Sequence, residues 1–79
     1  METEEIKSKL ENIFREVFTD PSLKLDGGLT ANDVDGWDSL SHMLLISEVE
    51  KEFSIKFRLS DLNKMRNVGD MMDIIVTKL

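Results

Sequence analysis

The sequence predicts an all-helical single domain covering residues 1–79, and three observations favour this class. Apolar residues recur at helical spacing in several segments. No stretch of convincing length alternates apolar and polar residues as a half-buried strand would. The chain of 79 residues contains no Cys, so disulfides and thiolate metal sites cannot stabilise so small a domain. Helix packing must therefore hold the fold together.

The first predicted helix lies within residues 3–20. We expect Thr3 to cap its amino end and Asp20-Pro21 to stop it. Its apolar residues fall on one helical face: Ile6, Leu10, Ile13, Phe14 and Val17.

Residues 19–38 break the helical periodicity, with Pro21 and an Asp26-Gly27-Gly28 turn inside them. The same stretch still carries four apolar residues: Leu23, Leu25, Leu29 and Val34. We therefore predict an ordered loop anchored by these side chains. Loops of this length in small domains are usually functional.

The second predicted helix begins at Asp38 or Ser39 and ends near Ser54. His42 falls on its buried side, one turn before the main apolar stripe. That stripe consists of Leu45, Ile46, Val49 and Phe53.

Two further helical segments are predicted near the carboxyl end. A short turn starts at Ser60 and runs through Leu62 and Met65, and Asn67 caps a last helix. The last helix is expected to turn six apolar residues inward: Val68, Met71, Met72, Ile75, Val76 and Leu79.

Charge and size narrow the function classes. Ten basic and sixteen acidic residues give a net charge of −6, which disfavours nucleic acid and anionic membranes as partners. No run approaches about eighteen apolar residues, so no membrane insertion is expected. The first residues do not show the basic segment followed by an apolar run that a secretory signal needs, which favours a cytoplasmic protein. A chain this short has little room for a deep pocket, so we do not expect an enzyme.

The most informative segment is residues 35–42, where an acidic, glycine-containing loop delivers Ser39 to the first turn of a helix. Helix capping by Asp38 explains part of this pattern. A calcium loop is rejected because Ala31 and His42 would stand where an oxygen ligand and a bidentate Glu are needed. A serine hydrolase is rejected because Gly-x-Ser-x-Gly is absent, and one His with scattered carboxylates offers no metal cluster. An exposed Ser at a helix start instead suits a phosphate ester.

The sequence resembles the acyl carrier protein family. The resemblance rests on Asp38-Ser39-Leu40 at the start of the second helix, Gly36 before it and residues 50–55 after it. Chain length, acidity and helix order extend it over essentially the whole chain.

The resemblance implies a right-handed four-helix bundle of acyl-carrier type, with a long first loop and a short third helix. It also implies that a phosphopantetheinyl transferase esterifies Ser39 with 4′-phosphopantetheine from coenzyme A, and that Asp38 supports this modification. The arm's thiol would carry acyl groups as thioesters to acyl ligase, synthase or acyltransferase partners of lipid, fatty acid, polyketide or envelope-glycan pathways. The chain itself would be a monomeric phosphoprotein that catalyses no reaction.

The exposed side of the second helix departs from the acidic pattern of typical fatty-acid carriers. Helical geometry places Leu40, Leu44, Ser47 and Lys51 opposite the buried stripe, with Met43 at its edge. We expect Leu40, Met43 and Leu44 to dock in an apolar groove of a partner, with Asp35, Asp38 and Glu48 steering from the rim. The competing expectation is that Leu44 packs against the long loop.

Trp37 stands where fatty-acid carriers often have a small residue, and we expect its ring to anchor the loop. The Trp-Asp-Ser-Leu-x-His pattern is similar to specialised stand-alone carriers. An aminoacyl or peptidyl carrier, and a helical interaction module without a prosthetic group, remain alternatives. Whether an interior pocket shelters the cargo stays open.

Overall fold

The computed structural model describes residues 2–79, so Met1, the first residue of the predicted domain, lies outside the described residues. Residues 2–79 form four helices and no strand, which confirms the predicted class. The helices are α1 (Thr3–Val17), α2 (Ser39–Phe53), α3 (Leu59–Leu62) and α4 (Val68–Lys78). None of these helices is long and apolar enough to cross a membrane.

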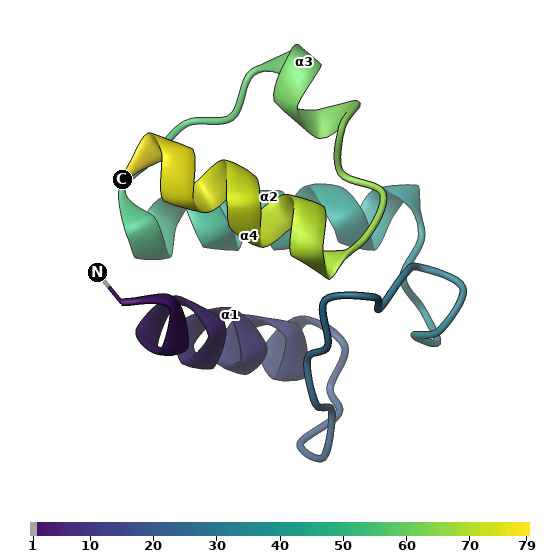
Figure 1. Ribbon diagram of the computed structural model, residues 1–79. Helices are drawn as coiled ribbons and strands as arrows, with labels where there is room; N and C mark the ends of the chain where they lie inside the picture. Colours follow the sequence, from purple (N-terminus) through teal and green to yellow (C-terminus); the bar gives the residue numbers. More distant parts are fainter. Residues whose placement is uncertain (1) are drawn as a thin grey trace.

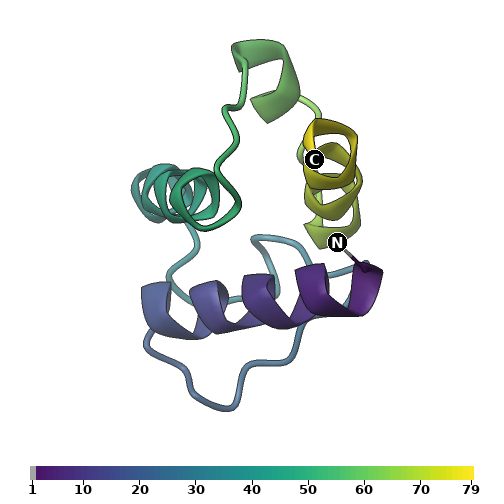
Figure 2. The same ribbon diagram turned by 90° about the vertical axis from the view of Figure 1, so that its left-hand side faces the viewer.

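The helices surround one shared interior (Figures 1 and 2). Figure 2 shows α2 and α4 on opposite sides of it, α1 running along one edge and the short α3 closing the other. This arrangement places the start of α2 at the end of the molecule where the connection between α3 and α4 descends (Figure 1).

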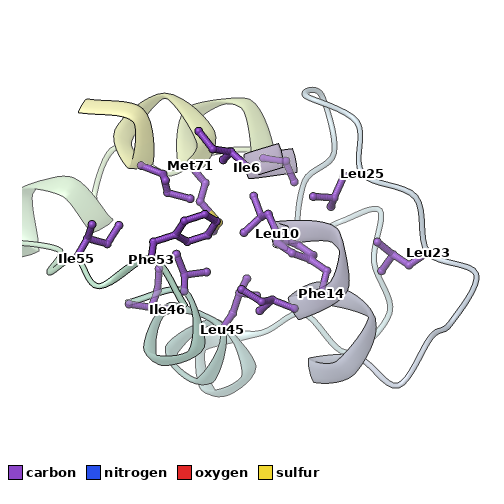
Figure 3. Packing of buried hydrophobic residues seen from close by; sticks show 14 residues of the cluster. Ile6, Leu10, Phe14, Leu23, Leu25, Leu45, Ile46, Phe53, Ile55 and Met71 are labelled. Carbon is purple, nitrogen blue, oxygen red and sulfur yellow. The ribbon is translucent and has the colours of Figure 1, made fainter. Parts of the chain in front are cut away.

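The core is built by the apolar stripes of the three long helices (Figure 3). Each fully buried large side chain contributes about 1.5–3 kcal/mol. Those with under 2% exposure are Phe14, Ile6, Leu10, Leu45, Met71, Ile75, Val49 and Val68. The predicted stripe of α2 is buried in full, and His42 beside it is half-buried.

The long loop is ordered, as predicted. Leu23 and Leu25 are buried, and Leu29 and Val34 pack against the core. Arg15 Nε donates to the Leu23 carbonyl at 2.7 Å, and the Leu25 N–H donates to Glu11 Oε2 at 2.9 Å.

The loop is also bonded to α4. The N–H groups of Val68 and Gly69 donate to the carbonyls of Leu29 and Gly27, both at 2.9 Å. These bonds connect the middle of the loop to the first turn of the last helix.

Several predicted helix ends were wrong. Thr3 is the first helical residue of α1, and Glu2 precedes it without a side-chain cap. α1 ends at Val17 and not at Asp20, because Thr19 adopts the left-handed φ of 51° and the Asp20 N–H returns to the Arg15 carbonyl.

The short third helix begins before the predicted cap at Ser60. Arg58 is its capping position, and the Asp61 carboxylate accepts the Arg58 N–H at 2.8 Å. An acid three residues after the cap position therefore starts this helix, and Ser60 lies inside it.

The last helix starts as predicted, since Asn67 Oδ1 accepts the Asp70 N–H at 2.8 Å. Its inward face is narrower than expected. Val76 is 50% exposed because it falls at the edge of the stripe, and Leu79 is 52% exposed because it lies beyond the helix end at Lys78.

Candidate functional site

The loop enters α2 through a tightly bonded turn. Asp38 Oδ1 accepts the Ser41 N–H at 2.9 Å, while Ser41 Oγ accepts the Asp38 N–H at 2.8 Å and donates to the Gly36 carbonyl at 2.7 Å. Gly36 has a φ of 86°, a left-handed conformation that glycine adopts without strain. These contacts fix the backbone immediately before the next residue, Ser39.

Ser39 is the first residue of α2 and is exposed. Its hydroxyl makes no hydrogen bond within residues 2–79, in contrast to that of Ser41. The structure thus holds the backbone of Ser39 firmly and leaves its oxygen free to react.

Asp38 is ionised at neutral pH. The hydrogen bond from the Ser41 N–H, helped by the Ser41 hydroxyl, lowers the pKa of the Asp38 carboxyl. This carboxylate accepts the Ser41 N–H, so that helix-start N–H group is already bonded within the turn.

Trp37 anchors the loop, as predicted. Its ring packs edge-on against Phe14 at 5.3 Å between centroids and contacts Phe18 at 5.9 Å. Its Nε1–H donates to His42 Nδ1 at 3.0 Å, and the two rings stack. Trp37 therefore connects the turn to both α1 and α2.

His42 is a packing residue and not the base of a nucleophilic pair. Its observed hydrogen bond goes to Trp37 and not to Ser39. Partial burial lowers the pKa of its imidazole, so it is neutral at pH 7. Within residues 2–79, no three His, Cys, Asp or Glu side chains are grouped closely enough to hold a metal.

An open cavity of about 400 Å³ lies beside Ser39. One part of its lining comes from the long loop and the start of α2, and the other from α3 and the connection that follows it. The lining residues are Ala31, Trp37, Asp38, Ser39, His42, Leu62, Met65 and Arg66. Sequence reasoning missed Arg66 as a site residue, since nothing local indicates that its segment returns to Ser39.

The outer face of α2 is apolar next to Ser39. Leu40 is 82% exposed, Met43 55% and Leu44 53%, so Leu44 does not pack away against the loop. Ser47 and Lys51 are exposed on the same helix, Glu48 is partly exposed, and Asp35 is exposed on the loop.

The arrangement fits an attachment site for a phosphodiester-linked group. A free, exposed hydroxyl stands on a rigid helix start beside an open cavity, with room for a chain to leave.

Comparison with known proteins also indicates an attachment site for a phosphodiester-linked group. The family model for the phosphopantetheine attachment site matches residues 8–75. An acyl carrier protein from Thermotoga maritima is 36% identical over 77 residues, covering 96% of this chain and 94% of that protein. The solution NMR structure of the holo acyl carrier protein from Geobacter metallireducens is similar with a TM-score of 0.86 and 49% identity, covering 91% of this chain and 83% of that one.

Proposed function

The chain belongs to the acyl carrier protein family, whose members carry acyl groups on phosphopantetheine, and on this premise we propose that Ser39 is the residue that bears the arm. The observation that supports Ser39 is its free hydroxyl on the bonded first turn of α2. When bound, the arm supplies the thiol that holds the acyl group as a thioester. Members of the family act as carriers and not as enzymes.

The neighbouring residues have distinct roles in this proposal. Asp38 and Ser41 hold the turn in the shape that presents the Ser39 oxygen to a phosphopantetheinyl transferase. Asp38 also offers an ionised carboxylate beside that oxygen, which suits the binding of the transferase's magnesium ion. Trp37 keeps the turn against the bundle.

The attachment is tested by intact-mass measurement after incubation with coenzyme A and a broad-specificity transferase. We expect the wild type and Ser8→Ala, which changes an exposed Ser on α1, to gain one phosphopantetheine mass. Ser39→Ala is expected to gain none. A mass gain on Ser39→Ala, or none on the wild type, contradicts the proposal.

We also propose that partner enzymes recognise the exposed apolar face formed by Leu40, Met43 and Leu44. These side chains lie next to Ser39 and are largely solvent-exposed, so an apolar groove on a partner would remove a substantial area from water. Asp35, Asp38 and Glu48 surround this face and steer partners with basic rims, while Ser47 and Lys51 continue it along α2.

The docking face is tested with Leu44→Glu. Losing the contact of an exposed Leu side chain and placing a carboxylate in an apolar groove is expected to lower the transferase's kcat/KM for this carrier about tenfold. Val76→Glu is the matched control, because Val76 has nearly the same exposure on α4 (50% against 53%). Equal kcat/KM for Leu44→Glu and Val76→Glu removes the docking proposal.

We further propose which class of enzyme loads this carrier and with which kind of group. The exposed apolar face and the Trp37–His42 pair distinguish this chain from an acid-studded general carrier, and they support service to dedicated acylation enzymes. Offering acyl and aminoacyl donors to the modified protein, with the ligases that activate each, tests this. Loading by a dedicated acyl ligase together with poor loading by general fatty-acid synthesis enzymes supports it, whereas efficient loading by the general enzymes, or exclusive loading with aminoacyl groups, overturns it.

A further inference from the structure

The surroundings of Ser39 carry an unbalanced charge once a phosphodiester is attached there. The ionised Asp38 carboxylate is the neighbouring side chain and already takes the Ser41 N–H at the helix start. A phosphodiester on Ser39 adds a second anion at the residue next to Asp38, and like charges repel each other. A cation near the cavity mouth would relieve this repulsion.

Arg66 meets that requirement. Of the eight residues that line the cavity beside Ser39, Arg66 alone is positively charged at neutral pH. His42 contributes no charge because partial burial lowers its pKa, and its Nδ1 accepts the Trp37 N–H.

The guanidinium of Arg66 is held at its base and free at its end. Its Nε lies 3.3 Å from Asp70 Oδ2, and the same oxygen accepts the Arg66 backbone N–H at 3.2 Å. The side chain is 84% exposed, and no other ion pair involves it within residues 2–79. Two terminal nitrogens therefore remain available, in the planar fork that matches phosphate oxygens.

We propose that Arg66 binds the phosphodiester of the arm attached to Ser39 and fixes the first link of the arm over the cavity. This inference rests on the proposed attachment at Ser39. Arg66 acts as a positioning residue: it orients the base of the arm, while the thiol end stays free to reach partner enzymes. Asp70 positions Arg66 by holding its Nε.

The test is ³¹P NMR of the modified protein. Wild type and variants are first checked by intact mass, so that a sample lacking the arm counts against the attachment proposal and not against this one. The phosphodiester resonance is then measured in the folded protein and in the same protein unfolded in urea. The difference between the two positions reports how the fold holds the phosphate.

We expect Arg66→Gln to lose most of this difference, because the amide keeps polarity but not the charge. Arg66→Lys should retain part of it, since Lys supplies a point charge without the fork. Lys64→Gln is the matched control: it removes one exposed positive charge from the same connection, at a residue outside the cavity lining. It should leave the resonance where the wild type has it.

High salt gives an independent readout, because an exposed ion pair weakens as the Debye length falls to about 3 Å at 1 M. The wild-type resonance should then move toward that of Arg66→Gln, which itself should move little. The proposal is overturned if Arg66→Gln keeps the wild-type resonance, if Lys64→Gln changes it equally, or if the folded and unfolded wild types already agree.

Discussion

Replacing Trp37 tests how the attachment turn is connected to the rest of the fold. The ring contacts Phe14, Phe18 and His42, and its Nε1–H is the donor to His42 Nδ1. Trp37→Phe keeps a ring but removes that donor, whereas Trp37→Ala removes both. The pair of variants therefore separates the hydrogen bond from the packing.

The magnitudes follow from these contacts. Loss of one neutral hydrogen bond costs about 1 kcal/mol. Loss of the aromatic contacts costs about 0.5–1.5 kcal/mol each, and truncating a fully buried large aromatic side chain costs about 3–5 kcal/mol. Because Trp37 is only partly buried, we expect about 1 kcal/mol for Trp37→Phe and about 3 kcal/mol for Trp37→Ala. The latter is a large share of the roughly 4–12 kcal/mol expected for a domain of this size.

The measurement is urea unfolding followed by circular dichroism at a helical wavelength. Trp37 is the only Trp of the chain, so its fluorescence gives an independent curve for the wild type alone. A free-energy loss below about 1 kcal/mol for Trp37→Ala would refute the anchoring role. Equal losses for the two variants would refute the division between packing and hydrogen bond.

Three further predictions concern other parts of the fold. Burial holds the pKa of His42 below its ordinary value of 6.5, so the unfolded chain binds the proton more readily than the folded one. The free energy of unfolding should therefore fall as pH drops through 6.5. In urea unfolding at several pH values, His42→Gln should remove this pH dependence. In Gly69→Ala a Cβ would lie 3.0 Å from the Gly27 carbonyl oxygen, so we expect a loss of about 1 kcal/mol in the same assay, whereas Gly28→Ala, with open space around its Cβ, should cost nothing. Lys78 lies 2.8 Å from Asp61 and is the main cause of that carboxyl's lowered pKa; Lys78→Met should raise this pKa toward its ordinary value in carbon-detected NMR, and an unchanged pKa would contradict the pairing.

Sequence reasoning succeeded where the determining contacts are local. The start of α2 was predictable because an Asp cap and a Ser one turn later act within three residues. The buried stripe of α2 follows directly from the helical period. The family resemblance then connected Ser39 with phosphopantetheine.

The errors arise where the chain had several nearby alternatives. Glu2, Thr3 and the acids that follow are all plausible helix starts. At the other end, α1 is terminated by Phe18 and Thr19, and the left-handed φ of Thr19 is not predictable from its residue type. Arg66 was missed for a different reason. It approaches Ser39 only because α3 and α4 fold back across the bundle, and no local pattern encodes that approach.

The hydrogen bonds that shape the turn before Ser39 all join residues at most five positions apart. If an enzyme displaces α3 or part of the long loop when it binds the carrier, these short-range hydrogen bonds need not break. Residues 36–41 then keep their conformation. The turn that presents Ser39 can keep its geometry while the rest of the bundle moves. Successive enzymes that bind different surfaces of the carrier would then meet Ser39 in the same position.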